Sequence, residues 1–518
     1  MKLLSAEESR RLDRLTQEKF AVPSYSLMSR AGEAVALALA ERWPESLAAG
    51  VLVVAGKGNN GGDGMVVARR LKDSGAKVRA VLLSRIAELK GDAALACREF
   101  LDAGGEVREA LDESALAPIF AEPAAILVDA VFGTGLNATV SGLPLRAIEL
   151  INACRAPVVA VDIASGVNAD TGAIMGAAVS ASLTVTFGLA KFGHFSYPGA
   201  DFCGDLEIAD IGFAPAAVEE ISPRGRWLES ADVRPLIRPR SANSHKGMFG
   251  HTLVIAGSLG KGGAPLLAAR GALRMGAGLV TVAIPESVAT IVAGGQAEIM
   301  TEPMPERDGH FEATESIARL NNVILGKDAV AVGPGIGVSD DTRQLIAFLI
   351  EQGARPDRPL LIDADGLNAL AEIGCEAASR ARGPVVLTPH PGEMARLLKS
   401  STAEINADRI TAARSLSQRT RAFVLLKGAR SVIAGPGGET YINSTGNPGM
   451  GTPGMGDALS GMIAALMGQR MRPLDALALG VFLHGYAADR VARSRGAIGY
   501  ITGDVIEDLP AALAALIS

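Results

Sequence analysis

Short, fully apolar segments alternate with helix-type patterns along the first part of the chain. The apolar segments are Val51–Gly56, Ala124–Gly135, Ala156–Gly166 and Leu183–Gly188. Strands that are apolar on both faces, with helices between the early ones, are typical of a parallel sheet covered on both sides. We therefore expect an N-terminal α/β domain with three layers.

This alternation loosens after Phe213 and then resumes. The segment between residues 215 and 235 is richer in charge and proline, which favours a domain boundary there. Strand and helix patterns return at residues 251–258, 265–278, 329–337, 359–370, 384–393 and 422–435. The halves share an alternation but no common motif, so we expect a second α/β domain fused to the first.

Composition narrows the class of protein. The chain has 518 residues, 48% of them hydrophobic, which suits two or three domains. The net charge is −6 and no basic block occurs, which argues against nucleic acid as the main partner. No apolar run is long enough to span a membrane, and the N-terminus is charged almost at once, so we expect a cytoplasmic protein.

A glycine- and proline-rich stretch, Gly446–Gly461, leads into a helix pattern. Apolar residues after Asp457 recur at helical spacing, at Leu459, Met462, Ile463, Leu466 and Met467. Glycines at a helix N-terminus offer free backbone N–H groups to an anion such as phosphate. Asp457 repels such an anion unless it acts as a general base, and the alternative is that it only caps the helix.

A second glycine cluster, Gly56–Arg70, follows the first apolar strand. Its residues Asn59, Asn60, Gly61, Gly62 and Asp63 form a loop at the carboxyl edge of the expected parallel sheet, where α/β folds bind ligands. Asp129 and Asp162 end later strands, so they can converge on the same crevice. The alternative for each aspartate is a turn or helix cap.

Motifs of the second half occur in an order that carries a resemblance. They are "GPGIG" (333–337), "DADGLNAL" (363–370), "TPHPGE" (388–393), "LLKGARSVI" (425–433) and "GTPGMGDALSG" (451–461), after the segment 244–282. Together they resemble the ADP-dependent NAD(P)H-hydrate dehydratase family, which has a ribokinase-like α/β fold, over residues 230–518. His390 stands where the ribokinase-like superfamily has an asparagine, which suggests chemistry other than sugar phosphorylation.

Motifs of the first half carry a second resemblance. The sequences "GKGNNGGDG" (56–64), "VDAVFGTGLN" (128–137) and "VDIASGV" (161–167) resemble the NAD(P)H-hydrate epimerase domain, a Rossmann-like three-layer fold, over residues 1–220. Ala164 stands where that family usually has proline. Proline would only stiffen the turn, so we expect little change.

The two resemblances together imply a bifunctional enzyme that repairs hydrated nicotinamide cofactors. The epimerase, an isomerase, interconverts the (R)- and (S)-hydrates. The dehydratase, a carbon–oxygen lyase, removes water from the (S)-hydrate with ADP as co-substrate, restoring NAD(P)H and releasing AMP and phosphate.

The resemblance also implies roles for individual residues of the epimerase. Its catalytic acid/base would be Asp162. The hydrate would contact Asn59, Asn60, Gly61, Gly62, Asp63, Gly133, Thr134, Gly135, Leu136, Asn137, Ala138, Thr139 and Asp162. A potassium ion would be held by Asn60, Asp129 and Ser165, all of which carry oxygen donors.

In the dehydratase, Asp457 would activate the hydrate hydroxyl toward the β-phosphate. The hydrate would contact Ala264, Gly335, His390 and Asp457, and ADP would contact Lys427, Gly428, Ala429, Arg430, Ser431 and Gly456. Magnesium is expected because it neutralises a transferring phosphoryl group. The expected partners are these small molecules, with no nucleic acid or membrane, and we expect a homo-oligomer.

Two rival functions stay open on the sequence alone. The second half could be a kinase of a small alcohol, and the first could be a non-catalytic binding module. Two histidines are expected to have no catalytic role: His194 as a loop or rim residue, and His484 as a core histidine with satisfied hydrogen bonds.

Overall fold

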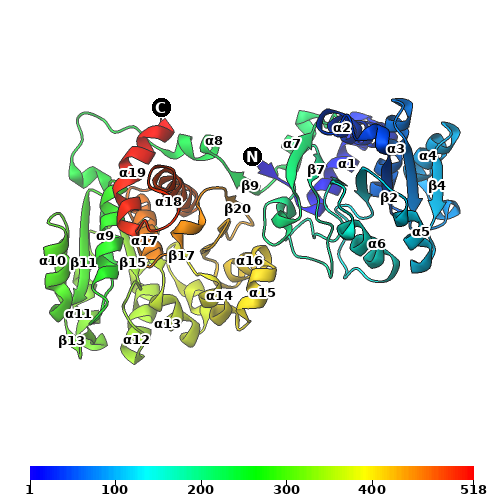
Figure 1. The fold of residues 1–518 in the computed structure, drawn as a ribbon. Coiled ribbons are helices and arrows are strands. Elements are labelled where there is room, and N and C mark those ends of the chain that lie inside the picture. The colour runs from blue at the N-terminus through cyan, green and yellow to red at the C-terminus, as the bar shows by residue number, and fades with distance from the viewer. Residues whose placement is uncertain (518) are drawn as a thin grey trace. The chain divides into compact units, whose positions relative to one another are not determined.

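The computed structural model describes residues 1–517, which fold into two compact units. One unit spans Lys2–Gly225, and the other begins at Arg226 and includes Met1. Each unit is a parallel-sheet α/β fold with helices against the sheet (Figure 1), as the apolar strand pattern predicted. No helix among residues 1–517 has the length and apolar character needed to cross a membrane.

The first unit contains one sheet whose paired strands all run parallel. Its spatial order is β4-β3-β2-β5-β6-β7-β8. The strands are β2 (Val51–Ala55), β3 (Val78–Leu82), β4 (Glu106–Glu109), β5 (Ile126–Ala130), β6 (Val158–Val161), β7 (Leu183–Phe187) and β8 (Asp205–Ala209). The helices are α1 (Ala6–Phe20), α2 (Ser24–Arg42), α3 (Asn59–Asp73), α4 (Gly91–Asp102), α5 (Leu116–Ala121), α6 (Gly142–Ala153) and α7 (Pro215–Ile221).

Alternate residues of β2 belong to two different hydrophobic clusters. Val51, Val53 and Ala55 pack in a cluster with residues of α2, α3 and α4. Leu52 and Val54 pack in a cluster with residues of α5 and α6. Because side chains alternate across a strand, the sheet carries helices on both faces, and the unit has the three layers that the sequence predicted.

The first unit changes direction between β2 and β5. The chain leaves β2, builds β3 and β4 on one side, and returns to place β5 on the other side of β2. Crevices outside the carboxyl ends of strands at such a switch point are where open α/β sheets bind ligands. The loop after β2 and the ends of β5 and β6 therefore meet at the expected site.

The second unit is built on a larger mixed sheet. Its order is β9-β20-β19-β18-β17-β16-β15-β10-β11-β12, parallel from β18 to β12 and antiparallel through β18, β19 and β20. The strands are β9 (Gly225–Leu228), β10 (His251–Ile255), β11 (Leu279–Pro285), β12 (Met300–Met304), β15 (Ala329–Val332), β16 (Leu360–Ile362), β17 (Val385–Leu387), β18 (Phe423–Leu426), β19 (Val432–Ala434) and β20 (Thr440–Asn443). The antiparallel edge is a hairpin that the pattern at 422–435 did not reveal.

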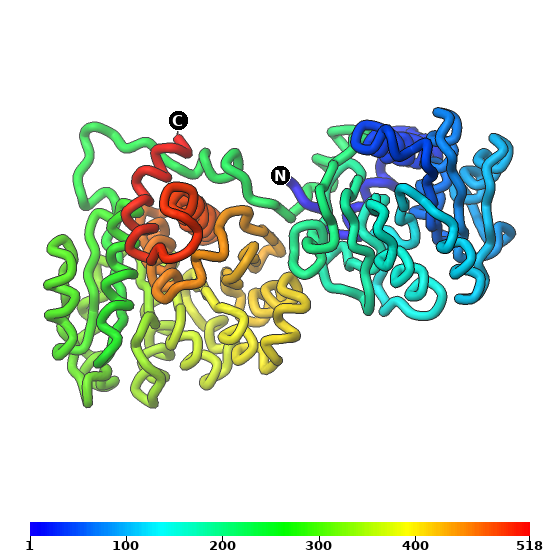
Figure 2. The backbone as a smooth tube through the Cα atoms, in the orientation of Figure 1, coloured from blue at the N-terminus to red at the C-terminus, as the bar shows by residue number. Residues whose placement is uncertain are grey.

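The helices of the second unit include one that is buried along nearly its whole length, α17 (Met455–Gly468). Its neighbours include α9 (Gly263–Arg274), and α18 (Pro473–Arg495) lies beside α19 (Thr502–Ile517), as Figure 2 shows. The others are α8 (Ser230–Val233), α10 (Ala289–Gly295), α11 (Ala313–Val323), α12 (Asp340–Phe348), α13 (Asp365–Ile373), α14 (Pro391–Leu398), α15 (Thr402–Ala407) and α16 (Arg409–Thr420). A short hairpin pairs β13 (Glu306–Arg307) with β14 (His310–Phe311).

Candidate active sites

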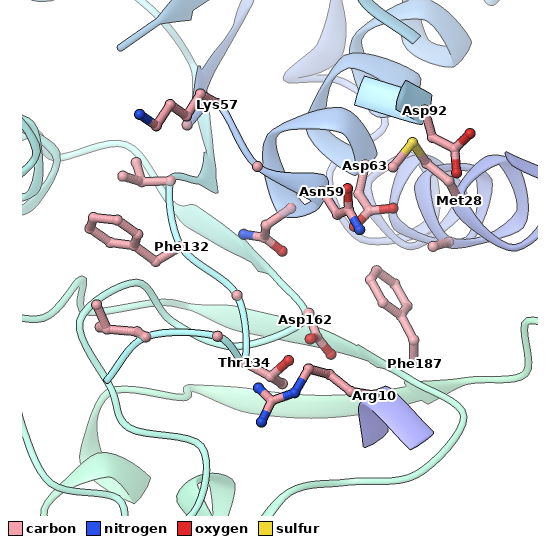
Figure 3. Close-up of a pocket in the computed structure, with 18 of the residues that line it drawn as sticks. Arg10, Met28, Lys57, Asn59, Asp63, Asp92, Phe132, Thr134, Asp162 and Phe187 are labelled. Carbon is pink, nitrogen blue, oxygen red and sulfur yellow. The ribbon is translucent and has the colours of Figure 1, made fainter. Parts of the chain in front are cut away.

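A cavity of about 1200 Å³ opens at the switch point of the first unit. Figure 3 shows Asp63 projecting from α3 on one side of the open space and Asp162 from the end of β6 on the other. Of the expected contacts, Asn59, Asn60, Asp63, Gly133, Thr134, Gly135, Leu136, Asn137, Ala138 and Asp162 line it.

Three expected contact residues do not line the cavity: Gly61, Gly62 and Thr139. A Cβ on Gly61 would lie 1.8 Å from the carbonyl oxygen of Gly56, and one on Gly62 would lie 2.9 Å from Cα of Ala93. These two glycines let the start of α3 pack closely against its neighbours. They shape the loop from behind rather than facing the cavity.

Asp162 is held in a left-handed backbone conformation at the end of β6, with φ of 67°. Its Oδ1 atom accepts hydrogen bonds from Nζ of Lys191 at 2.6 Å and from Oγ1 of Thr186 at 3.0 Å. Burial alone would raise the pKa of Asp162, but the Lys191 ammonium outweighs it and holds that pKa below its ordinary value. Asp162 is therefore an ionised carboxylate at the cavity wall.

His194 supports the same aspartate from the backbone side. Its Nδ1 accepts the backbone N–H of Lys191 at 3.0 Å, so Nε2 carries the proton and donates to the carbonyl oxygen of Asp162 at 2.9 Å. Burial, together with the charge of Lys191, lowers the pKa of His194 to about 4, which keeps the ring neutral. His194 lies in the connection between β7 and β8, so it is a loop residue, but it is only 2% exposed and therefore does not lie at a rim.

Asp129 lies at the end of β5 and is fully buried. Its two oxygens accept hydrogen bonds from the hydroxyl of Ser165 at 2.6 Å and from the backbone N–H of Ser165 at 2.8 Å. Burial raises the pKa of Asp129 to about 6, and no lysine or arginine within residues 1–517 forms an ion pair with it. Nδ2 of Asn60, another expected potassium ligand, is buried without a hydrogen-bond partner within residues 1–517.

Two further carboxyls reach this cavity. Asp63 projects from the second turn of α3, and Asp13 projects from α1. Burial, and then the charges of Asp162 and Asp13, raise the pKa of Asp63 well above its ordinary value. Burial also raises the pKa of Asp13 to about 6. The cavity thus combines one ionised carboxylate with carboxyls that retain their protons more easily.

In the second unit, a buried ion pair lies where β16 and β18 end. Nζ of Lys427 donates to Oδ1 of Asp363 at 2.6 Å, and the hydroxyl of Ser460 donates to Oδ2 of Asp363 at 2.6 Å. Burial alone would lower the pKa of Lys427, but Asp363 outweighs it and raises that pKa. Lys427 is therefore a fixed positive charge beside the first turns of α17.

Asp457 lies in the first turn of α17, but it does not cap the helix. The N-cap is Gly454, with φ of 90°, and no side chain accepts a capping hydrogen bond there. The alternative that Asp457 is only a helix cap is therefore wrong. Burial, and then the charge of Asp363, raise the pKa of Asp457 to about 7. No hydrogen bond from another group within residues 1–517 occupies its carboxylate, which leaves it available to a ligand.

His390 takes the N-cap position of α14. Its Nδ1 accepts the backbone N–H of Gly392 at 3.0 Å, and Glu393 accepts the backbone N–H of His390 at 2.8 Å. Asparagine caps helices in the same way, so the substitution keeps the capping function. Burial, and then Lys427, lower the pKa of His390, so the ring is neutral and its Nε2–H is a donor.

Two pairs of expected contacts in the second unit lie next to each other. A Cβ on Gly335 would lie 3.1 Å from Cβ of Ala264, so these residues touch. A Cβ on Gly456 would lie 3.2 Å from Nζ of Lys427. Lys427 and the start of α17 therefore lie next to each other, where a phosphate could contact both.

Some residues at these sites were missed from the sequence. They are Lys191, His194, Asp13, Asp363 and Ser460. Asp363 directly follows a predicted apolar strand, so the strand-end rule that identified Asp162 could have found it. His484 was expected to have satisfied hydrogen bonds, but its buried Nε2 atom has no partner within residues 1–517.

Two family models match the chain. One, described as NAD(P)H-hydrate dehydratase, matches residues 252–511. The other, described as YjeF-related protein N-terminus, matches residues 24–193. The matched ranges contain the side chains of both sites described above, except Asp13 and His194, which lie outside residues 24–193.

Curated relatives match along nearly the whole chain. A protein of Moorella thermoacetica named bifunctional NAD(P)H-hydrate repair enzyme Nnr is 43% identical and covers 98% of this chain, which spans 96% of its length. The protein of that name from Escherichia coli is 35% identical, with 97% and 92% covered. A crystal structure of ADP/ATP-dependent NAD(P)H-hydrate dehydratase from Bacillus subtilis, co-crystallised with ATP and Mg²⁺, is 29% identical over 56% of this chain and 98% of its own, with a TM-score of 0.49.

Proposed function

Since the chain belongs to the family of bifunctional NAD(P)H-hydrate repair enzymes, we propose that the cavity beside Asp162 inverts the hydrate and the site around Asp457 dehydrates it. The first activity interconverts the (R)- and (S)-hydrates of NAD(P)H. The second removes water from the (S)-hydrate with ADP and restores NAD(P)H. Membership of this family decides against both rivals, a kinase of a small alcohol and a non-catalytic binding module.

In the epimerase site, Asp162 acts as acid/base at the carbon that inverts. The support is its ionised state beside Lys191 and its position on the wall of the 1200 Å³ cavity. The residues of Asn59–Asp63 and Gly133–Thr139 that line the cavity contact the hydrate. Gly61, Gly62 and Thr139 do not line it and act through the shape that they give these loops.

A potassium ion at Asn60, Asp129 and Ser165 fits the residues present. Asp129 is a buried carboxylate without a cationic partner within residues 1–517, and such a charge is costly unless it is paired. The amide of Asn60 has a buried polar atom without a partner, so no protein hydrogen bond fixes which end points to a ligand. When bound, the ion supplies the missing positive charge and holds the loops around the cavity.

In the dehydratase site, Asp457 takes the proton from the hydroxyl of the (S)-hydrate as that oxygen attacks the β-phosphorus of ADP. AMP leaves, and the oxygen becomes a phosphate ester. The C–O bond then breaks with phosphate as leaving group, a proton leaves the adjacent carbon, and the ring double bond returns. Lys427, with the backbone of Gly456, binds the phosphates, and Ala264, Gly335 and His390 contact the hydrate.

Magnesium fits this site only if the nucleotide supplies most of its ligands. Both oxygens of Asp363 are already bound by Lys427 and Ser460. Within residues 1–517 no cluster of three or more His, Cys, Asp or Glu side chains could hold a metal. Magnesium commonly binds substrate phosphates and water in this way, and it neutralises their charge.

The observation that carries the dehydratase role is the free carboxylate of Asp457 beside Lys427 and Gly456. The direct test is to mix the purified protein with chemically prepared hydrates, ADP and Mg²⁺, and to follow the absorbance of restored NADH. Phosphorylated small alcohols, with no NADH, would point to a kinase instead. A homo-oligomer in the cytoplasm is our proposal for its state in the cell, which gel filtration and cell fractionation test.

A further inference from the structure

Asp63 is a second carboxyl on the cavity wall, across the open space from Asp162 (Figure 3). It projects from the second turn of α3 and lines the cavity, yet its side chain accepts no hydrogen bond within residues 1–517. Its charged neighbours are Asp162 at the end of β6, Asp13 on α1, Asp92 on α4 and Lys191 after β7. The charge of Lys191 lowers the pKa of Asp63, but this ammonium is bound to Asp162. Burial, together with the acidic neighbours, outweighs it and raises the pKa of Asp63.

The carboxylate of Asp162 has one oxygen bound by other residues and one oxygen without a hydrogen bond within residues 1–517. Its Oδ1 atom is bound by Lys191 and Thr186, while Oδ2 has no hydrogen bond within residues 1–517. Figure 3 shows Asp63 and Asp162 on facing sides of the open space, one on a helix and one at a strand end. A ring bound between them would meet one carboxyl on each face.

The chemistry of the hydrate, which rests on the proposed epimerase function, requires groups on both faces. Water adds to the enamine double bond of a dihydronicotinamide with its oxygen on the carbon bonded to the ring nitrogen. Inversion there needs the C–O bond to break on one face and to re-form on the other. The leaving oxygen needs a proton, and the incoming water must lose one.

We propose that Asp63 is the second catalytic carboxyl of the epimerase and works on the face opposite Asp162. Asp63 protonates the leaving hydroxyl, the nitrogen lone pair forms a C=N bond, and a water molecule departs. A second water adds to the other face of the iminium carbon, its electron pair forms the new C–O bond, and Asp162 takes its proton. In the reverse direction Asp162 gives the proton and Asp63 accepts one.

The charge of the cavity suits the cationic intermediate. Asp13 and Asp92 also line the cavity. Its buried cation, Lys191, is paired with Asp162, while Arg10, Arg14 and Lys57 are exposed lining residues. Carboxylates near a developing positive charge stabilise it, most strongly where water is excluded. An iminium ion is therefore favoured between Asp63 and Asp162.

The test separates the two faces by oxygen exchange. Each pure epimer is incubated in ¹⁸O-labelled water, and mass spectrometry follows both label uptake and inversion. Wild-type protein should invert and label both epimers. Asp63→Asn and Asp162→Asn should each lose inversion by about 10²–10⁴-fold, and each should still exchange the oxygen of one epimer, a different one for each variant. Asp73→Asn, at the exposed end of the same helix, should behave as wild type.

Several results would overturn this assignment. Inversion at the wild-type rate by Asp63→Asn would remove Asp63 from the reaction, and exchange of the same epimer by both variants would put both carboxyls on one face. Retained exchange of one epimer shows that a variant site is folded. If Asp63→Asn melts early, Asp63→Glu keeps the acid and should retain slow inversion, and its complete inactivity with native melting would also contradict the proposal. Failure of the wild type to invert would contradict the proposed function itself.

Discussion

The ammonium of Lys191 lies 2.6 Å from Oδ1 of Asp162, and the two side chains are only 2% and 13% exposed. A carboxylate so far removed from water stays ionised only because this cation is held against it. His194 fixes the backbone on which both residues depend, through hydrogen bonds to each. The reactivity of Asp162 is therefore set by residues that need not touch the substrate.

Replacing Lys191 with methionine should raise the pKa of Asp162, because burial then acts without the compensating charge. A base with a raised pKa ionises only at higher pH, so the acid limb of the pH profile of epimerase activity should shift to higher pH. The lost partner of a buried charge should also cost about 3–5 kcal/mol of unfolding free energy. Profiles of kcat/KM for inversion and denaturant melts measure the two effects.

Lys77→Met removes an exposed lysine of the same unit and serves as the matched control. Adding Asp162→Asn to Lys191→Met should recover stability but not activity, since no unpaired charge remains buried. An unshifted pH profile in Lys191→Met would contradict the role of Lys191 in setting the charge of Asp162.

Asp457→Asn should lower dehydration by about 10²–10⁴-fold, the usual cost of losing a general base. ADP binding should be nearly unchanged, because Lys427 and the backbone of Gly456 remain. Turnover of the (S)-hydrate and calorimetry with ADP measure the two properties. Asp357→Asn, an exposed aspartate of the same unit, is the control. Near-normal turnover in Asp457→Asn would contradict the assignment of Asp457 as the catalytic base.

The dehydratase of the wild-type chain should lose activity as the pH falls through about 7. Burial and the charge of Asp363 raise the pKa of Asp457 to about 7, so its base form is lost below that pH. The profile of kcat/KM for the (S)-hydrate should therefore rise with pH across this range. A profile that is flat from pH 5 to 8 would contradict this role, because it would mean that no base ionising in that range controls the step.

Gly456→Val should weaken ADP binding. Even a Cβ at this position would lie 3.2 Å from Nζ of Lys427, and the valine methyl groups extend further into the space that a phosphate needs. Gly294→Val, at a helical glycine with no atoms within 4 Å of its added Cβ, is the matched control. Calorimetry that finds unchanged ADP affinity in Gly456→Val would remove this residue from the nucleotide site.

The positions of Asp129 and Asp162 at strand ends, and of the glycine loop before Asp457 at a helix start, could be predicted because the local sequence pattern alone determines them. An apolar run fixes where a strand ends, and a parallel sheet brings those ends to one edge. The same reasoning predicted α17 within a few residues of its observed start.

Other features depend on contacts between distant segments. Lys191 looks like an ordinary surface lysine in the sequence, and only packing against β6 and β7 buries it. The tautomer of His194 follows from a hydrogen bond to a backbone N–H, which no residue pattern encodes. The antiparallel hairpin of β18 and β19 depends on a turn at Lys427–Ser431, and the apolar pattern of two short strands does not give their direction.

The most direct measurement is the progress curve of a mixed pool of (R)- and (S)-hydrates with ADP and Mg²⁺. Wild-type protein should convert the whole pool to NAD(P)H. Asp162→Ala should convert the initial (S) fraction promptly and the (R) fraction only as fast as it epimerises spontaneously, because sites in separate units rarely couple strongly. The curve should become biphasic, with a fast amplitude equal to the initial (S) fraction. A complete, single-phase curve from Asp162→Ala would contradict the assignment of inversion to the cavity beside Asp162.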